Sequence, residues 1–140
     1  MDFNMLGPVI SLGLATAGSC IGCGIAGQAS HGVMSRVEDG HGKFIGMSAA
    51  PSSQSIYGFI LMLLMKGKIL AGSLSPIDAI GIGLFCGMTF MLSSIYQGMV
   101  AASGIQASAR QPAIYGKCWA AIGIVESFAL FAFVFALMLM

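Results

Sequence analysis

The sequence contains few charged residues. Asp, Glu, Lys and Arg make up 8% of its 140 residues, whereas 57% are hydrophobic. Soluble domains carry about 25% charged residues, because charged groups keep their surfaces hydrated. A chain with so little charge cannot cover a globular surface with polar groups. The composition therefore predicts that part of the surface faces lipid.

Several functional classes lack their usual signatures. The net charge is +1 and no basic patch is present, so nucleic acid is not an expected partner. The first five residues lack the positive segment of a secretory signal, so the first apolar stretch is expected to be mature structure. No pattern indicates a catalytic residue or an organic cofactor. The four cysteines lie in or beside apolar stretches, where we expect small packing residues rather than a disulfide framework or a metal pair: Cys20, Cys23, Cys86 and Cys118.

The ionisable residues divide the chain into four apolar segments. A helix needs about 20 predominantly apolar residues to cross the hydrocarbon core of a bilayer, and all four segments are long enough. The sequence predicts an all-α membrane protein with four transmembrane helices, at about 5–34, 44–66, 78–109 and 116–140. Pro51 falls inside the second segment and is expected to kink it, because proline lacks a backbone N–H.

The two halves of the chain, 1–70 and 71–140, resemble each other. An offset of 74 residues takes Arg36 onto Arg110 and Lys43 onto Lys117 without a gap, and several glycines also coincide. We interpret this pattern as the duplication of a two-helix hairpin, with both hairpins starting on the same side of the membrane. On this alignment Glu126 in the second half falls opposite Ser52 in the first.

Basic residues are unevenly distributed between the two ends of the hairpins. Four of the six belong to the turns, and two, Lys66 and Lys68, lie at the other end. Cytoplasmic loops carry an excess of Lys and Arg. This four-to-two bias predicts that the turns face the cytoplasm and that both termini lie outside.

Glu126 is the only acidic residue that cannot be placed at a loop or a terminus. A charge at the centre of a membrane helix costs roughly 2.5–3.5 kcal/mol on insertion scales, so such residues are rare and usually functional. Glu126 follows Lys117 by nine residues, or roughly 13 Å of helix, which places it near the middle of the bilayer. The alternatives are a paired acid in the core of a soluble protein and a purely structural membrane protein, and the latter leaves Glu126 unexplained.

Other polar residues are expected at the same depth as Glu126. They are Ser53, Gln54 and Tyr57 in the second segment and Gln97 in the third. Taken singly, each glutamine is more typical of a hydrogen bond between helices, and Tyr57 of packing. Together with a backbone carbonyl near Pro51 they form a set of oxygen ligands, which suits a hard cation rather than zinc or copper. A monovalent cation would leave such a site neutral.

Three motifs resemble a known family. They are Gly123-Ile-Val-Glu126-Ser-Phe-Ala, Pro51-Ser-Ser-Gln54-Ser-Ile-Tyr57 and Gln97-Gly-Met-Val-Ala-Ala-Ser-Gly-Ile-Gln106. Through them the chain resembles the four-helix rotor-ring proteolipid, subunit K or c, of V-type and archaeal-type rotary ATPases. The resemblance implies a Na⁺ site made by Glu126, Gln97, Gln54, Ser53 and the backbone carbonyl of Ala50, with Tyr57 bonded to Glu126. Ser53 and Ala50 depart from the threonine and the larger residue that are usual there, and both substitutions keep the oxygen.

The resemblance also implies a mechanism and a set of partners. Identical protomers would form a homo-oligomeric ring that turns against a stator subunit with an essential arginine, and Glu126 would carry one Na⁺ per protomer. The ring would couple this transport to ATP hydrolysis or synthesis without being catalytic itself. Central-stalk subunits would contact the cytoplasmic turns at Arg36, Arg110, Gln111 and Pro112. The expected location is the plasma membrane of a prokaryote, as a multi-pass protein.

Two alternatives to a sodium rotor stay open. Proton-driven relatives need only the carboxylic acid, so H⁺ is the alternative coupling ion. A small multidrug-type antiporter also has four short helices and one membrane glutamate. In that class, however, the acid usually lies in the first helix beside aromatic residues, whereas Glu126 lies in the fourth.

Overall fold

The computed structural model describes residues 3–140, and within this range every regular element is a helix. The elements are η1 (Phe3–Met5), α1 (Leu6–Met34), α2 (His41–Ala49), η2 (Ala50–Ser52), α3 (Ser53–Leu70), α4 (Pro76–Arg110), η3 (Pro112–Ile114) and α5 (Tyr115–Leu139). The predicted all-helical fold class is confirmed.

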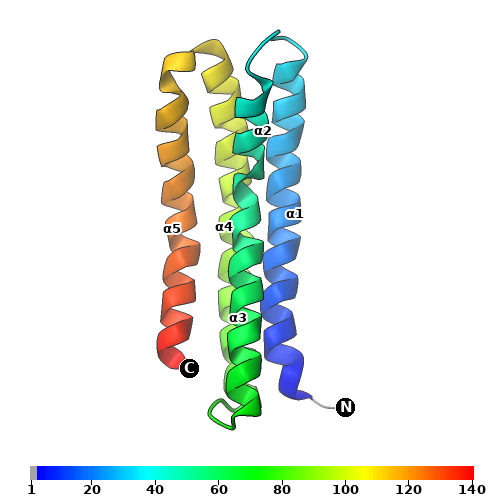
Figure 1. The fold of residues 1–140 in the computed structure, drawn as a ribbon, viewed down its shortest axis with the longest axis vertical. Coiled ribbons are helices and arrows are strands. Elements are labelled where there is room, and N and C mark those ends of the chain that lie inside the picture. Colours follow the sequence, from blue (N-terminus) through cyan, green and yellow to red (C-terminus); the bar gives the residue numbers. More distant parts are fainter. Residues whose placement is uncertain (1–2) are drawn as a thin grey trace.

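The helices form two hairpins that stand side by side (Figure 1). The first consists of α1 and the bent unit α2–η2–α3, and the second consists of α4 and α5. The turns after α1 and after α4 lie at one end of the bundle, and the N-terminal side and the C-terminus lie at the other (Figure 1). Both hairpins therefore run in the same direction, as the duplicated sequence requires.

Local signals explain where these helices begin and end. Pro76 occupies the first turn of α4, and Ser75 caps it by accepting a hydrogen bond from the backbone N–H of Asp78 at 3.2 Å. Gly40 and Gly72 have φ angles of 79° and 73°, in the left-handed region that other residues avoid. They lie in the two turns where the chain reverses after α1 and after α3.

The second predicted transmembrane segment is interrupted at Pro51. Because this residue has no backbone N–H, the helix passes through the short 3₁₀ turn η2 between α2 and α3. Ser52 Oγ donates to the carbonyl of Ala49 at 2.7 Å, and Ser53 Oγ donates to that of Ala50 at 3.2 Å. The hydroxyls of both serines that follow Pro51 thus bind carbonyl groups three residues earlier in the chain.

Three helical stretches are long and apolar enough to cross a membrane as continuous units: Phe3–Met34, Pro76–Arg110 and Pro112–Leu139. The bent unit of the first hairpin runs alongside them over much of the same height (Figure 1). These spans support an integral membrane protein.

Glycines allow α1 and α4 to approach closely along their length. A Cβ atom on Gly98 would overlap the carbonyl oxygen of Gly22, and one on Gly83 would overlap that of Gly7. Small residues at such contacts let membrane helices pack backbone against backbone. The α1–α4 pair therefore forms the centre of the bundle, and α3 and α5 pack outside it.

Replacing Gly98 by alanine should destabilise the bundle. The added methyl group meets backbone rather than a movable side chain, and overpacking of this kind costs about 1–3 kcal/mol. Gly46→Ala is the matched control, because no atom lies within 4 Å of the position that its Cβ would take. Thermal unfolding of the detergent-solubilised protein, followed by circular dichroism, should show a lower Tm for Gly98→Ala alone. Equal Tm values for the two variants would contradict the close contact.

Candidate ion-binding site

A polar layer crosses the bundle between two apolar clusters. One cluster, on the side of the termini, includes Leu61, Phe90 and Ala129. The other, on the side of the turns, includes Met47 and Ile122 and contains no charged residue. The polar side chains between them come from all four long helices: Ser19, Gln54, Ser93, Ser94, Gln97 and Glu126.

Two side chains from other helices donate hydrogen bonds to the carboxylate of Glu126. Tyr57 Oη on α3 donates to Oε1 at 2.7 Å. Gln97 Nε2 on α4 is 3.4 Å from Oε2, which is a long contact, and it also donates to the carbonyl of Ile122 at 3.3 Å. Glu126 is itself half-buried on α5. Its carboxylate therefore lies where α3, α4 and α5 meet, with one side toward the exterior of the chain.

The two predicted glutamines are linked to each other and fully buried. Gln54 Nε2 donates to Gln97 Oε1 at 3.0 Å and to Ser93 Oγ at 3.3 Å. Burying an amide without partners would cost about 1–3 kcal/mol. This network satisfies the amides, and it orients Gln97 so that its N–H group faces the carboxylate.

Ser53 and the carbonyl of Ala50 lie next to each other beside this network. Ser53 Oγ is 3.2 Å from the Ala50 oxygen and 3.2 Å from Gln54 Oε1. Both groups thus lie beside Gln54, whereas the hydrogen bonds of Glu126 go to Tyr57 and Gln97. The six predicted residues form one connected polar group, in which Gln54 and Gln97 are the bridge.

Ser93 belongs to the site although the sequence-based prediction did not include it. Its hydroxyl accepts from Gln54 and donates to the backbone carbonyl of Val125 at 3.0 Å, one residue before Glu126. Its position offered a signal, because Ser93 precedes Gln97 by four residues and so shares its helix face. On the opposite side of the layer, Ser94 Oγ donates to the Pro51 carbonyl at 2.7 Å and holds the broken helix against α4.

The site has one formal negative charge and no basic side chain in its hydrogen-bond network. The nearest basic residue before Glu126 on the same helix is Lys117, about 13 Å away at 1.5 Å of rise per residue. Buried or lipid-facing charges are stable only when they are compensated. A cation bound by the carboxylate, or a proton on it, would supply that compensation.

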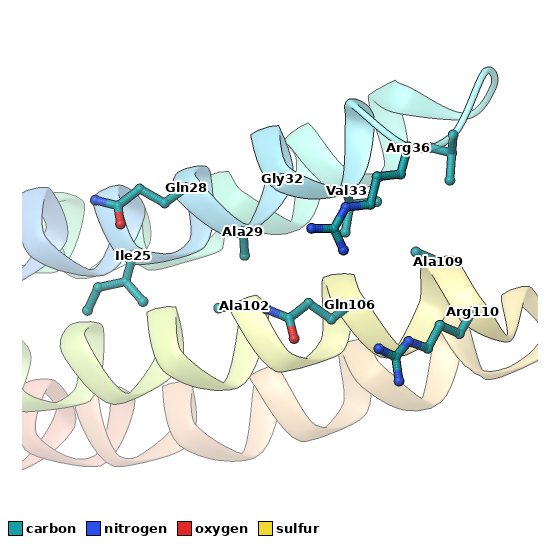
Figure 2. Close-up of a pocket in the computed structure, with 11 residues that line it drawn as sticks. Ile25, Gln28, Ala29, Gly32, Val33, Arg36, Ala102, Gln106, Ala109 and Arg110 are labelled. Atoms are coloured by element: carbon teal, nitrogen blue, oxygen red, sulfur yellow. The ribbon is translucent and has the colours of Figure 1, made fainter.

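A groove lies near the turns, away from the polar layer. It measures about 580 Å³ and runs between α1 and α4, with Gln28 and Arg36 on one wall and Gln106 and Arg110 on the other (Figure 2). Arg36, Arg110, Gln111 and Pro112 are all exposed at this end of the bundle. None of the residues that line this groove belongs to the polar group around Glu126.

Replacing Gln97 by methionine should destabilise the protein by about 1–3 kcal/mol, because Gln54 and the Ile122 carbonyl would lose buried partners. Gln106→Met, on the same helix but exposed, should change the stability by less than about 0.5 kcal/mol. Thermal unfolding in detergent measures both changes. If both variants unfolded at the wild-type temperature, the buried network would contribute nothing to stability.

Known proteins resemble this chain over almost its whole length. A sequence model of the family described as the C subunit of ATP synthase matches it twice, at residues 6–65 and 80–139. The chain is 31% identical over 135 residues to A-type ATP synthase subunit K of Methanocaldococcus jannaschii, covering 96% of this chain and 60% of that protein. It is 29% identical over 143 residues to V-type sodium ATPase subunit K of Enterococcus hirae, covering 97% of this chain and 91% of that protein. The chain thus spans less than two thirds of the archaeal relative, and the two family matches confirm the internal duplication.

Proposed function

This chain belongs to the family of the ATP synthase C subunit, because the model of that family matches both of its halves, and from this premise we propose its function. The chain is the rotor proteolipid of a V-type or A-type rotary ATPase. It is not catalytic alone, and copies of it form a ring in the membrane. The single observation that carries the proposal is the carboxylate of Glu126, held in mid-helix by Tyr57 and Gln97 at the edge of the bundle. Family membership favours this role over the antiporter alternative.

Sodium is the proposed coupling ion, with H⁺ as the alternative. Glu126 belongs to a connected polar group that also contains the oxygens of Ser53, Gln54, Gln97 and Ala50, and such a set suits a hard cation. A proton would need only the acid. The relative from Enterococcus hirae, a sodium ATPase subunit by name, also favours sodium.

Sodium binding requires a local rearrangement of Gln97. Its amide N–H faces Glu126, and its oxygen accepts from Gln54. Turning the amide over would direct its oxygen toward a cation held by the carboxylate, and the amide of Gln54 would turn with it, because its Nε2 donor would otherwise face the Gln97 Nε2 donor. Tyr57 could keep its hydrogen bond to Glu126 during this change, because it binds the other carboxylate oxygen.

The cycle follows from the cost of charge in lipid. With a monovalent cation bound, the site around Glu126 has no net charge and can turn past the lipid. At a stator subunit, an arginine would favour release of the ion into one aqueous half-channel, and another half-channel would reload the site. The exposed turns at Arg36 and Arg110–Pro112 contact the central stalk, which links rotation to ATP hydrolysis or synthesis. The proposed location is the plasma membrane of a prokaryote.

Carbodiimide labelling tests the site directly. The reagent reacts with protonated carboxyl groups in apolar surroundings, so Glu126 alone should be modified. Na⁺ should slow the reaction by displacing the proton, and the rate should fall as the pH rises. Mass spectrometry of the labelled protein locates the modification.

The labelling results separate the two coupling ions. A labelling rate that depends on pH but not on Na⁺ would indicate that H⁺ is the coupling ion. Modification of other acids at a similar rate would show that Glu126 is not a special site. Glu126→Gln serves as the unreactive control.

Tyr57→Phe should weaken the protection by Na⁺. The lost hydrogen bond stabilises the carboxylate, which binds Na⁺, relative to the protonated acid, which the reagent attacks. Because such a bond is worth about 1.5 kcal/mol, half-protection should need roughly tenfold more Na⁺. Tyr115→Phe is the control, because Tyr115 stacks edge-on against Trp119 near the turn. An unchanged Na⁺ dependence of labelling in Tyr57→Phe would show that Tyr57 does not contribute to Na⁺ binding.

Arg110→Ala tests the stalk contact. In the assembled ATPase this variant should keep Na⁺ protection of Glu126 while ATP-driven Na⁺ transport falls, because Arg110 is exposed in the turn and far from the site. Lys66→Ala, at the opposite end of the first hairpin, should keep both activities. Normal transport by Arg110→Ala would argue against the contact.

A further inference from the structure

The break at Pro51 separates two main-chain groups that a continuous helix would join. They are the Pro51 carbonyl and the N–H of Ser55, which are four residues apart, the spacing of an α-helical hydrogen bond. Because α3 begins at Ser53, the Ser55 N–H lies in the first turn, where N–H groups have no partner in their own helix. Both groups need partners from elsewhere, because an unpaired main-chain group at membrane depth is costly.

Two serines from other helices bind these groups. Ser19 Oγ on α1 accepts from the Ser55 N–H at 3.1 Å, and Ser94 Oγ on α4 donates to the Pro51 carbonyl at 2.7 Å. The two hydroxyl oxygens are 3.5 Å apart, and both side chains are buried. We call this arrangement of two hydroxyls and two main-chain groups the serine clasp.

The serine clasp encloses the residues that supply neutral oxygens to the proposed site. Ser53 and Gln54 lie between Pro51 and Ser55, and Ala50 directly precedes Pro51. Ser53 Oγ is 3.2 Å from the Ala50 oxygen and 3.2 Å from Gln54 Oε1. The hydroxyls of the clasp bind main-chain groups and each other rather than these oxygens. The clasp therefore acts on the ligands through the backbone that bears them.

We propose that Ser19 and Ser94 are positioning residues of the ion site, and that the serine clasp gives this site its preference for Na⁺ over H⁺. The inference rests on the proposed function, in which Glu126 carries Na⁺. A Na⁺ ion needs several oxygens at defined positions, and a site whose supporting groups are loose loses affinity. A proton needs only the carboxylate. Holding the broken segment in place therefore favours Na⁺ and leaves proton binding unchanged.

The partners of the carboxylate are held independently of the clasp. The ring centroid of Tyr57 lies 6.3 Å from that of Phe90 and 6.0 Å from that of Phe133. Gln97 donates to the Ile122 carbonyl on α5. Loss of the clasp should therefore move the ligand oxygens on either side of the break more than it changes the hydrogen bonds of the carboxylate.

The second hairpin has no equivalent break. The counterparts of Pro51 and Ser55 are Val125 and Ala129, and α5 runs without interruption through both. The Val125 carbonyl accepts a hydrogen bond from Ser93 at 3.0 Å. The hairpin that supplies the carboxylate thus has a continuous helix, whereas the hairpin that supplies the neutral oxygens has the break and the clasp. This difference associates the clasp with ligand positioning rather than with hairpin packing, which both halves share.

Two alanine variants test the proposal by separating Na⁺ binding from proton binding. Ser94→Ala and Ser19→Ala should each raise the Na⁺ concentration that half-protects Glu126 from carbodiimide about tenfold, which corresponds to about 1.4 kcal/mol. The pH dependence of labelling without Na⁺ should stay that of the wild type. Labelling is measured in native membranes that contain the assembled ATPase.

Ser108→Ala is the matched control. Ser108 is also buried on α4, but its hydroxyl donates to the Ile105 carbonyl of its own helix at 3.2 Å. This variant removes the same atom from the interior without affecting the clasp, so both the Na⁺ midpoint and the pH profile should be unchanged. Ser19→Ala provides the test if Ser94→Ala does not assemble, and failure of both to assemble would show a structural role and overturn the proposal.

ATP-driven Na⁺ uptake gives a second measurement. Both clasp variants should need more Na⁺ for the half-maximal rate and should reach the wild-type maximal rate when Na⁺ saturates. A clasp that only stabilised the fold would lower the maximal rate, through loss of assembled complex, and would leave the half-saturating Na⁺ concentration unchanged.

Unchanged Na⁺ midpoints in both clasp variants, or an equal shift in Ser108→Ala, would overturn the proposal. A pH profile that shifts together with the Na⁺ midpoint would also overturn it, because the serines would then act on the carboxylate itself. A wild-type protein whose labelling does not respond to Na⁺ would contradict both this proposal and sodium coupling. Unchanged variants of a Na⁺-protected wild type would contradict the role of the clasp alone.

Discussion

A carboxylate in the middle of a membrane helix needs compensation, and the polar groups of this chain are arranged around that requirement. Glu126 accepts a hydrogen bond from Tyr57 and lies beside Gln97, and Gln97 is in turn held by Gln54. Apolar clusters close the polar layer on both sides. Hydrogen bonds orient the carboxylate but leave its charge in place. A cation or a proton would complete the arrangement, as the proposed ion carrier requires.

The close approach of α1 and α4 makes this arrangement possible. Gly22 and Gly98 allow backbone contact one residue beyond Gln97, so the buried amide of Gln97 is directed toward α3 and α5. The break at Pro51 allows Ser94 to bind a main-chain carbonyl and brings Gln54 within reach of Gln97. The close packing of α1 against α4 and the placement of the Gln97 amide therefore both depend on Gly22 and Gly98.

The duplicated hairpins have diverged in function. The second carries Glu126, and the first carries Ser52 at the equivalent position together with the tyrosine and glutamine that complete the site. The residues equivalent to Tyr57 and Gln54 are Phe131 and Phe128, both exposed in the single chain. Each chain therefore has one polar site, and apolar side chains stand at the equivalent positions of Tyr57 and Gln54. This division reduces the number of charges that must be compensated in the membrane.

Periodicity and composition were sufficient to predict the all-helical fold, the duplication and the kink at Pro51, because lipid forces the backbone of long apolar segments into helices. The isolated acid in an apolar run predicted that Glu126 is the centre of a site, and the structure places polar side chains of α3 and α4 beside it. The partners of each polar atom could not be predicted, because they depend on the rotation of each helix about its axis. The tertiary structure was needed to place Ser93 between Gln54 and Val125. It also showed that the N–H of Gln97 faces Glu126. Ser53 and Ala50 proved to lie beside Gln54 and not on the carboxylate. Sequence spacing determines which residues share a depth, whereas the packing of α1 against α4 decides which of their atoms meet.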